Sequence, residues 1–173
     1  MDVMEAVKRR YSVRRYQDRP VEPEKLERVL EAARLAPSAS NVQEWRFLVV
    51  QEPATRSALA EAARGQSFVG QAPVVIVACA ADTRKVMPCG LPSFQIDVAI
   101  ALEHIALQAT SEGLGTCWIG AFDEARVKKL LGIPDQARVV ELMPLGYPAD
   151  QGGPKQRMAM SEIAMRERWE AAW

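Results

Sequence analysis

Residues 74–80 read VVIVACA, an unbroken apolar run that Pro73 introduces. The run is too short for a free-standing helix and is rich in valine and isoleucine, so it predicts a buried strand. Residues 45–51, WRFLVVQ, are mostly β-branched or aromatic and are followed by Pro53, so they predict a second, largely buried strand. These two segments are the expected centre of the core.

Helices and shorter strands are expected around this centre. Residues 93–112 are apolar on almost every face, which is typical of a helix buried all round, with Ser93 as its N-cap and Gly113 at its end. The basic stretch 8–16, in which the first helix is expected to end, and the segment 82–92 are expected to be irregular. Further helices are expected at residues 2–9, 23–36, 53–63, 123–131 and from 161 to the end, and further strands at 116–119 and 138–145.

The composition fits one globular domain spanning residues 1–173. The chain has 173 residues, 49% of them hydrophobic, and its 22 Lys and Arg balance 22 Asp and Glu. A net charge of zero gives no overall field to attract nucleic acid or an anionic membrane. The longest apolar run, residues 74–81, is less than half of the roughly 20 residues that cross a bilayer. With no signal-peptide pattern at residues 1–10, a cytoplasmic protein is expected.

Common catalytic and metal-binding motifs are missing from the sequence. The sequence has three cysteines without a CxxC pair and a single histidine, His104, so neither a structural zinc nor a disulfide framework is expected. His104 is expected to be a satisfied core residue. Cys117 is expected to be buried and structural, and Cys89 to be more exposed. Residues 113–115, GLG, follow a helix rather than a strand, so they are not a dinucleotide fingerprint.

Two cationic clusters stand near opposite ends of the chain. The first contains Arg9, Arg10, Arg14 and Arg15, and the second is the KQR segment at residues 155–157, after a Gly-Gly-Pro turn. Arginine and lysine together suit one compact phosphate. Solvated surface, or nucleic-acid binding by the first cluster, are the alternatives that the clusters alone leave open.

In order and spacing, four segments from residue 2 to residue 157 resemble the nitroreductase family of flavoproteins. The segments are Arg10-x-Ser12-x-Arg14, Pro37-Ser38-x-x-Asn41-x-Gln43-x-Trp45, Gly113-Leu-Gly115-Thr116-Cys117-Trp118-Ile119-Gly120 and Lys155-x-Arg157.

The resemblance implies an α+β fold with a central, mainly antiparallel sheet flanked by helices, in an intertwined homodimer. FMN would lie at the subunit interface, and residues 161–173 would form a helical arm on the partner, with Met165, Trp169, Ala172 and Trp173 along one stripe. The first and last motifs would hold the phosphate and ribityl chain, the second would line the flavin from the partner subunit, and the third would bring backbone to the flavin N5 and O4 edge. The implied cofactor-binding residues are Arg10, Tyr11, Ser12, Arg14, Pro37, Ser38, Ser40, Asn41, Gln43, Ile119, Gly120, Ala121, Lys155 and Arg157.

The activity that the resemblance implies is reduction of nitroaromatics, quinones or similar small acceptors by NADH or NADPH, with ping-pong hydride transfer through flavin N5. The sequence departs from the family at Glu44, where many members have proline, and in the brief segment 81–94, where larger relatives insert a lid. A short lid predicts an open site and broad acceptors. The alternatives are an FMN carrier or redox-sensing module, or a specialised dehalogenase or ene/azoline oxidoreductase.

Overall fold

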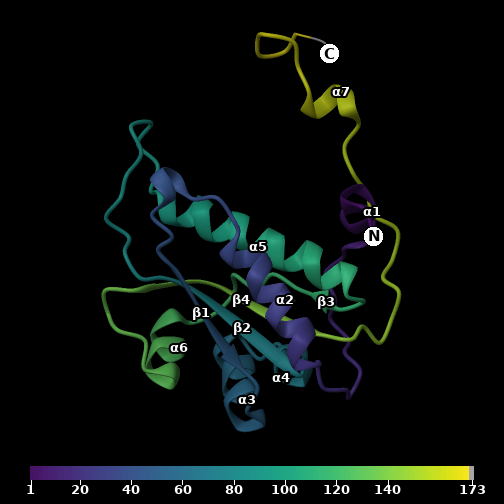
Figure 1. The fold of residues 1–173 in the computed structure, drawn as a ribbon, viewed down its shortest axis with the longest axis vertical. Coiled ribbons are helices and arrows are strands. Elements are labelled where there is room, and N and C mark those ends of the chain that lie inside the picture. The colour runs from purple at the N-terminus through teal and green to yellow at the C-terminus, as the bar shows by residue number, and fades with distance from the viewer. Residues whose placement is uncertain (172–173) are drawn as a thin grey trace.

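The computed structural model describes residues 1–171. In this part of the chain, four antiparallel strands form one sheet in the order β1-β2-β4-β3. Figure 1 shows the sheet crossing the middle of the molecule, with helices on both sides. The strands are β1 (Trp45–Val50), β2 (Val74–Ala80), β3 (Gly115–Thr116) and β4 (Arg138–Gly146).

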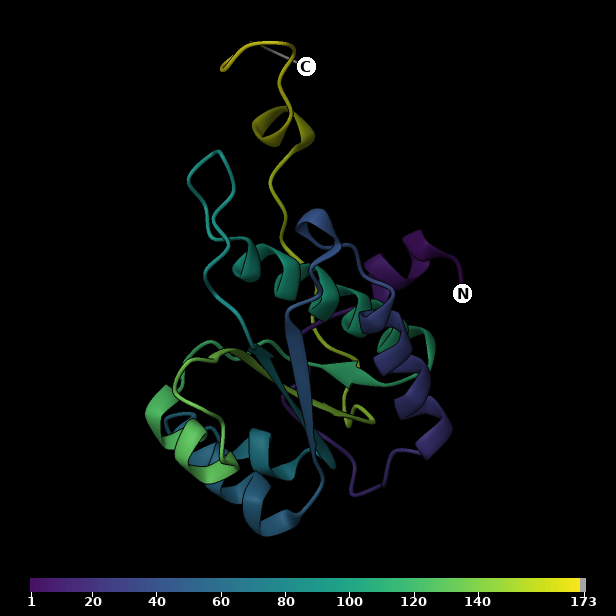
Figure 2. The same ribbon diagram turned by 60° about the vertical axis from the view of Figure 1, so that its left-hand side comes forward.

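The helices form two layers, one on each face of the sheet. The long helix α5 packs against one face, with α2 beside it, and α3, α4 and α6 cover the other, as Figure 2 shows from the side. Among the described residues, no helix is both long and apolar enough to span a bilayer. The helices are α1 (Val3–Arg9), α2 (Pro23–Arg34), α3 (Pro53–Ala62), α4 (Ser67–Gln71), α5 (Ser93–Ser111), α6 (Glu124–Leu131) and α7 (Met160–Ile163), with a short 3-10 turn η1 (Ala39–Asn41).

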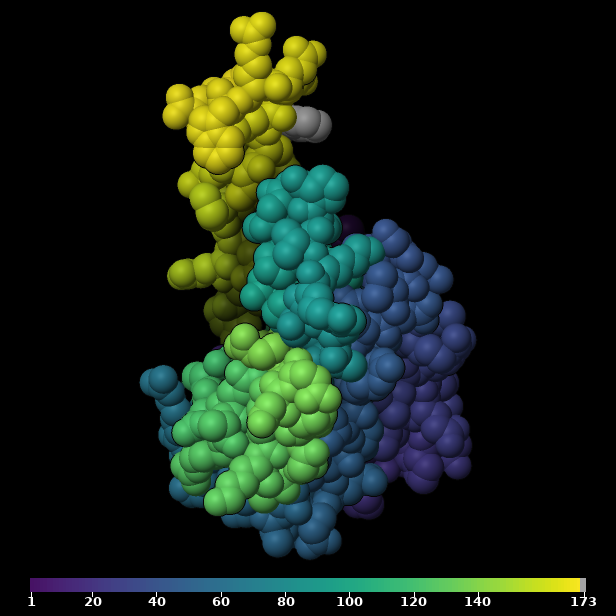
Figure 3. Space-filling view, turned by 90° about the vertical axis from the view of Figure 1, so that its left-hand side faces the viewer, coloured from purple at the N-terminus to yellow at the C-terminus, as the bar shows by residue number. Residues whose placement is uncertain are grey.

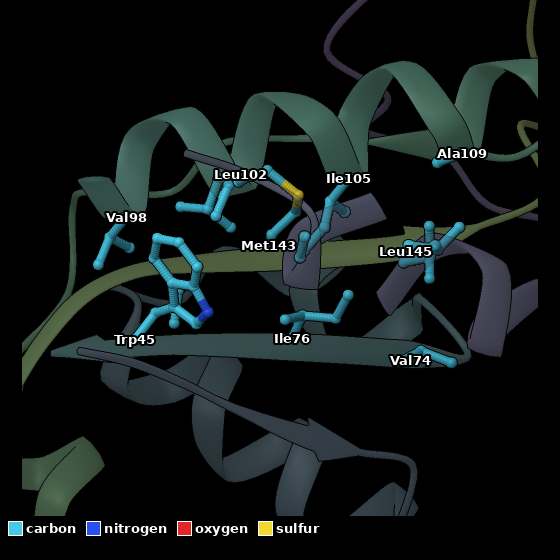
Figure 4. Packing of buried hydrophobic residues seen from close by; sticks show 14 of the residues in the cluster. Trp45, Val74, Ile76, Val98, Leu102, Ile105, Ala109, Met143 and Leu145 are labelled. Atoms are coloured by element: carbon cyan, nitrogen blue, oxygen red, sulfur yellow. The ribbon is translucent and has the colours of Figure 1, made fainter. Parts of the chain in front are cut away.

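Strand β2 explains why residues 74–80 are apolar without interruption. Successive side chains of a strand point to opposite faces, and both faces of this sheet are covered. Ile76 packs beneath α5 and Val77 packs against the opposite layer, and both are fully buried. Figure 4 shows the core between the sheet and the α5 layer, in which Leu102 and Ile105 of α5 face the sheet.

Most expected elements are confirmed, with ends that differ by a few residues. Two details of the prediction are wrong. Ser93 is the first helical residue rather than the N-cap, and its hydroxyl faces Glu44 instead of capping α5. The strand expected at 116–119 covers only residues 115–116, because the chain then bends and returns to the sheet through a single bridge between Ile119 and Leu142. Helix α4 was not predicted, since five residues are too few to show a period.

The helix predicted from residue 161 to the end is wrong for the described residues. Helix α7 contains only residues 160–163, and positive φ angles at Glu167 and Glu170 turn the chain out of helical geometry. Figure 3 shows this segment standing clear of the main body. The Trp169 side chain is 84% exposed. The helical stripe had no surface of its own chain to pack on, and its last members, residues 172–173, lie outside the described residues.

Candidate functional site

The two ends of the chain bring three cations together. Arg10 follows the last turn of α1, and the Nζ of Lys155 donates a hydrogen bond to the carbonyl of Lys8 in that turn. Partial burial, followed by the charges of Arg10 and Arg157, lowers the pKa of Lys155. Arg10 and Arg157 therefore both lie within electrostatic reach of Lys155, although 145 positions of sequence separate Arg10 from Lys155.

An open cavity of about 880 Å³ lies between these two ends. Tyr11 forms one wall, with its hydroxyl donating to the carbonyl of Asp150 at 2.5 Å and lying 3.0 Å from Asp150 Oδ1. Burial and the Asp150 contact raise the pKa of Tyr11 to about 12. Gly152 has φ +69° and passes so close that a Cβ there would lie 2.7 Å from the ring, so only glycine fits. The cavity is lined by Lys8, Arg9, Tyr11, Pro148, Asp150, Gln151, Gly153 and Lys155.

Arg10 has a buried hydrogen-bond donor without an acceptor. Its Nε atom is buried and has no hydrogen-bond partner among the described residues. The Glu103 carboxylate on α5 is its ion-pair partner, but at 3.7 Å that contact is too long for a hydrogen bond. A buried cationic donor without a partner is costly, and phosphate oxygens are strong acceptors for it. The residues present therefore fit a phosphate-bearing ligand.

The segment after Arg10 is fixed against β3. Ser12 forms a parallel bridge with Thr116, and the backbone N–H of Val13 donates to the Thr116 carbonyl at 2.9 Å. The approach is so close that a Cβ on Gly115 would lie 2.3 Å from the Val13 side chain. The exposed Arg14 points back along its own segment, with Nη1 3.5 Å from the Ser12 carbonyl. The first motif is thus held beside the third.

After β3, the chain passes from a buried residue, Ile119, to an exposed backbone edge at residues 120–121. Ile119 is buried and exchanges backbone hydrogen bonds of 3.0 and 3.2 Å with Leu142, whereas Gly120 and Ala121 are exposed. Beneath them lies Glu141 of β4, whose Oε2 is 3.6 Å from the place a Gly120 Cβ would occupy. Burial raises the pKa of Glu141 to about 7.

The segment from Pro37 to Gln43 lies elsewhere. Its residues Ser40, Asn41 and Gln43 are exposed and have φ angles of 54°, 56° and 55°, a region that costs non-glycine residues of order 1 kcal/mol or more each. Internal hydrogen bonds hold the shape, including Gln43 N–H to Ser38 Oγ at 3.0 Å and Gln43 Nε2 to Asn41 Oδ1 at 2.9 Å. Such stored strain is typical of functional segments.

The structure brings three of the four motifs together and leaves the fourth apart. Figure 1 shows α1 beside the C-terminal end of α5 and η1 at its N-terminal end. Asp97, which bonds to η1, and Glu103, which pairs with Arg10, are six residues apart on α5, about 9 Å along its axis. The residues that line the cavity all come from 8–11 and 148–155, so the 37–43 segment of the same chain is not part of its wall.

Several residues of the site were not predicted. Asp150 and Gly152 contact Tyr11, Glu103 forms an ion pair with Arg10, and Glu141 lies under the 120–121 edge. The sequence offered a signal only for Gly152, which belongs to a Gly-Gly pair before a cationic segment. The expectations for cysteine are confirmed, since Cys117 is buried, with its pKa raised by burial, and Cys89 is exposed.

The expectation for His104 is confirmed in part, because the side chain is only half-buried, with Nδ1 3.2 Å from the Ala32 carbonyl. The described residues contain no cluster of three metal-ligating His, Cys, Asp or Glu side chains.

Known proteins are similar to this chain in both structure and sequence. A solved structure of a nitroreductase family protein from Clostridium difficile is similar, with a TM-score of 0.87 and 35% sequence identity over 98% of this chain and all of that one. A Thermus thermophilus protein named NADH dehydrogenase is 34% identical, covering 95% of this chain and 96% of its own length. A Bacillus subtilis protein named FMN reductase [NAD(P)H] is 30% identical, covering 96% of this chain and 74% of its own.

The family model described as "Nitroreductase family" matches residues 7–67 and 63–147. The chain belongs to the nitroreductase family and is an oxidoreductase.

Proposed function

We propose that the protein is a homodimeric, FMN-dependent NAD(P)H oxidoreductase that reduces nitroaromatics, quinones or similar small acceptors. Its cofactor is FMN, and its electron donor is NADH or NADPH, as in the relative named FMN reductase [NAD(P)H]. One observation carries the proposal. Lys155 lines the cavity between the two ends of the chain, Arg10 and Arg157 lie within electrostatic reach of Lys155, and Arg10 Nε is buried without a partner among the described residues.

The chain's own residues divide the task of binding. The three converged cations hold the phosphate, and Ser12 and Arg14 lie beside them for the ribityl chain, because the bridge to β3 fixes their segment. The exposed edge at Gly120 and Ala121 presents backbone groups to the flavin ring. Bound FMN supplies the hydride chemistry, so the protein needs no nicotinamide fingerprint and no acid–base triad.

A second copy of the chain supplies what one copy lacks. The 37–43 segment, which includes Pro37, Ser38 and Asn41, does not line the cavity of its own chain, so we infer that it lines the site of the partner. The C-terminal segment also needs a surface to cover, because large apolar side chains stand exposed along it. They are Met158 at 62%, Met160 at 63%, Ile163 at 63% and Trp169 at 84% exposure.

The site is expected to be open to bulky acceptors. The segment between β2 and α5 is short and largely exposed, with Val86 and Leu91 more than half exposed. It contacts the strained segment of its own chain through Lys85, whose Nζ donates to the Ala39 carbonyl at 2.6 Å. A segment of this length covers little of a flavin face, so we infer broad acceptor use.

An absorbance spectrum of the purified protein tests the proposal, with mass identification of any released chromophore. We expect bound FMN that bleaches on anaerobic addition of NADH or NADPH and recovers its colour when a quinone or nitroaromatic is added. A protein that neither carries nor takes up FMN contradicts the proposal. FMN that stays oxidised with both nucleotides indicates a carrier instead.

A further inference from the structure

Two buried acids lie behind the strained segment. Glu44 at the start of β1 is 5% exposed and Asp97 in the first turns of α5 is 3% exposed. Glu44 Oε1 is 3.4 Å from the hydroxyl of Ser93, which is itself fully buried. Glu44 Oε2 and Asp97 Oδ2 are buried and accept no hydrogen bond from any described residue. Nothing in the cofactor site described above uses either carboxyl.

The two unpartnered oxygens can satisfy each other only if a proton lies between them. Two ionised carboxylates can only accept hydrogen bonds, whereas a protonated carboxyl can donate one to its neighbour. Burial, opposed by the Glu44 backbone N–H and the Ser93 hydroxyl and reinforced by the hydrogen bond and charge of Asp97, raises the pKa of Glu44. The buried cost of two adjacent negative charges acts in the same direction.

Nearby cations do not neutralise the pair. Lys85 points its Nζ at the Ala39 carbonyl, and Arg46 points its guanidinium at the carbonyls of Gln43 and Trp45. The next charged residues, Asp82 and Arg84, pair with each other at 2.6 Å on the surface. A shared proton is thus the arrangement that these neighbours leave for the two acids.

The pair is connected to the strained segment through the backbone of one residue, Ala39. Asp97 Oδ1 accepts a hydrogen bond from the Ala39 N–H at 3.0 Å, and Lys85 holds the Ala39 carbonyl. The next residues, Ser40 and Asn41, have the positive φ angles. If both acids were ionised, their repulsion would separate α5 from β1, and Ala39 would lose the acceptor that fixes the start of this strained turn.

We propose that Glu44 and Asp97 share one proton, and that the neutralised pair positions the 38–43 segment for contact with FMN. Both are positioning residues, acting through the backbone of Ala39. This inference rests on the proposed function, because it takes the segment to line the FMN site. It predicts that FMN affinity falls as rising pH removes the shared proton.

The test measures the Kd of FMN for the apoprotein from about pH 5.5 to about pH 9, with flavin fluorescence as the signal. Wild type and Glu44→Gln are compared. The glutamine amide donates to Asp97 and accepts from Ser93 at every pH, so it imitates the protonated acid. We expect the wild-type Kd to rise by up to about tenfold per pH unit above the raised pKa of Glu44. The ratio of the wild-type Kd to the Glu44→Gln Kd cancels titration of the FMN phosphate, which occurs near pH 6.

Two more variants separate positioning from general damage. Glu61→Gln changes an exposed glutamate on α3, beyond the opposite face of the sheet, and should keep the wild-type pH profile. Glu44→Ala leaves Asp97 and Ser93 without their partner, and should weaken FMN binding at every pH. A Kd ratio of wild type to Glu44→Gln that stays constant across the pH range would overturn the proposal.

A second readout needs no cofactor. In the folded apoprotein the raised pKa of Glu44 makes the native state hold a proton that the unfolded state releases, so stability falls as pH rises above about 4.5. The midpoint of thermal unfolding should therefore drop with pH more steeply for wild type than for Glu44→Gln. Parallel curves overturn the shared proton. Wild-type protein that binds no FMN at any pH but shows the divergent curves refutes the proposed function and leaves the shared proton standing.

Discussion

Replacing Arg157 with alanine should weaken FMN binding without disturbing the fold. The side chain is exposed, and the hydrogen bond that the structure gives it goes to the carbonyl of its neighbour Gln156 at 2.7 Å. An exposed residue of this kind changes stability by at most about 0.5 kcal/mol. A hydrogen bond from a charged group to phosphate contributes about 1.5 to 3 kcal/mol, which corresponds to a rise in Kd of about 10- to 150-fold.

The neighbouring cations place the effect in the lower part of this range. Arg157 and Arg10 both lower the pKa of Lys155, so removing one of them relieves a repulsion that the apoprotein otherwise retains. We expect the Kd for FMN to rise by about 10- to 30-fold at low salt, and by less at high ionic strength, where exposed charges are screened.

Riboflavin distinguishes a phosphate contact from a general loss of binding. It has the same ring and ribityl chain without the phosphate, so Arg157→Ala should leave its affinity unchanged when both ligands are titrated by fluorescence quenching. The matched control is Arg84→Ala, which removes an arginine that is 90% exposed and pairs with Asp82 away from the cavity. Equal loss of FMN and riboflavin affinity, or unchanged FMN affinity, would refute the assignment of Arg157 to the phosphate.

Three further predictions concern stability and assembly. Gly115→Ala would bring a methyl group to 2.3 Å from Val13 Cγ2 and should lower the free energy of unfolding by about 1 to 3 kcal/mol. Denaturant unfolding measures this loss, and a variant as stable as wild type would contradict the close packing. Burial raises the pKa of Glu141 to about 7, so the free energy of unfolding should fall by at most about 3 kcal/mol as pH rises from about 4.5 to about 7. Denaturant titrations of Glu141→Gln should lose this pH dependence, and a variant whose stability depends on pH as the wild type's does would contradict the raised pKa. Removal of residues 161–173 should shift the protein from dimer toward monomer in sedimentation, and an undiminished dimer would show that the segment is dispensable.

The central elements could be predicted because local chemistry and tertiary packing agree there. The valine-rich run of β2 and the apolar faces of α5 each have one way to bury their side chains, and Asp123 caps α6 through a hydrogen bond to the Arg126 N–H at 3.1 Å. The C-terminal stripe had the same helical spacing but no surface of its own chain to cover it, so spacing alone predicted a helix that the described residues do not form.

The candidate site could be predicted by residue type more than by arrangement. Arg10 and Lys155 were predicted to bind a phosphate, but whether the two residues lie close together depends on how the whole chain folds between them. Nothing in the sequence of the 38–43 segment indicated three left-handed residues without glycine, because the acceptor that fixes its first turn, Asp97, comes from a distant helix. Glu44 was visible only as a departure from the family pattern.

The separation of the cations and the strained segment along α5 has a genetic consequence. In the proposed dimer, each site joins the cations of one chain to the segment of the other. A dimer made of one Arg157→Ala chain and one Glu44→Ala chain therefore has one site with both defects and one with neither. Two poorly active variants, co-expressed, should complement each other and recover activity in their mixed dimers.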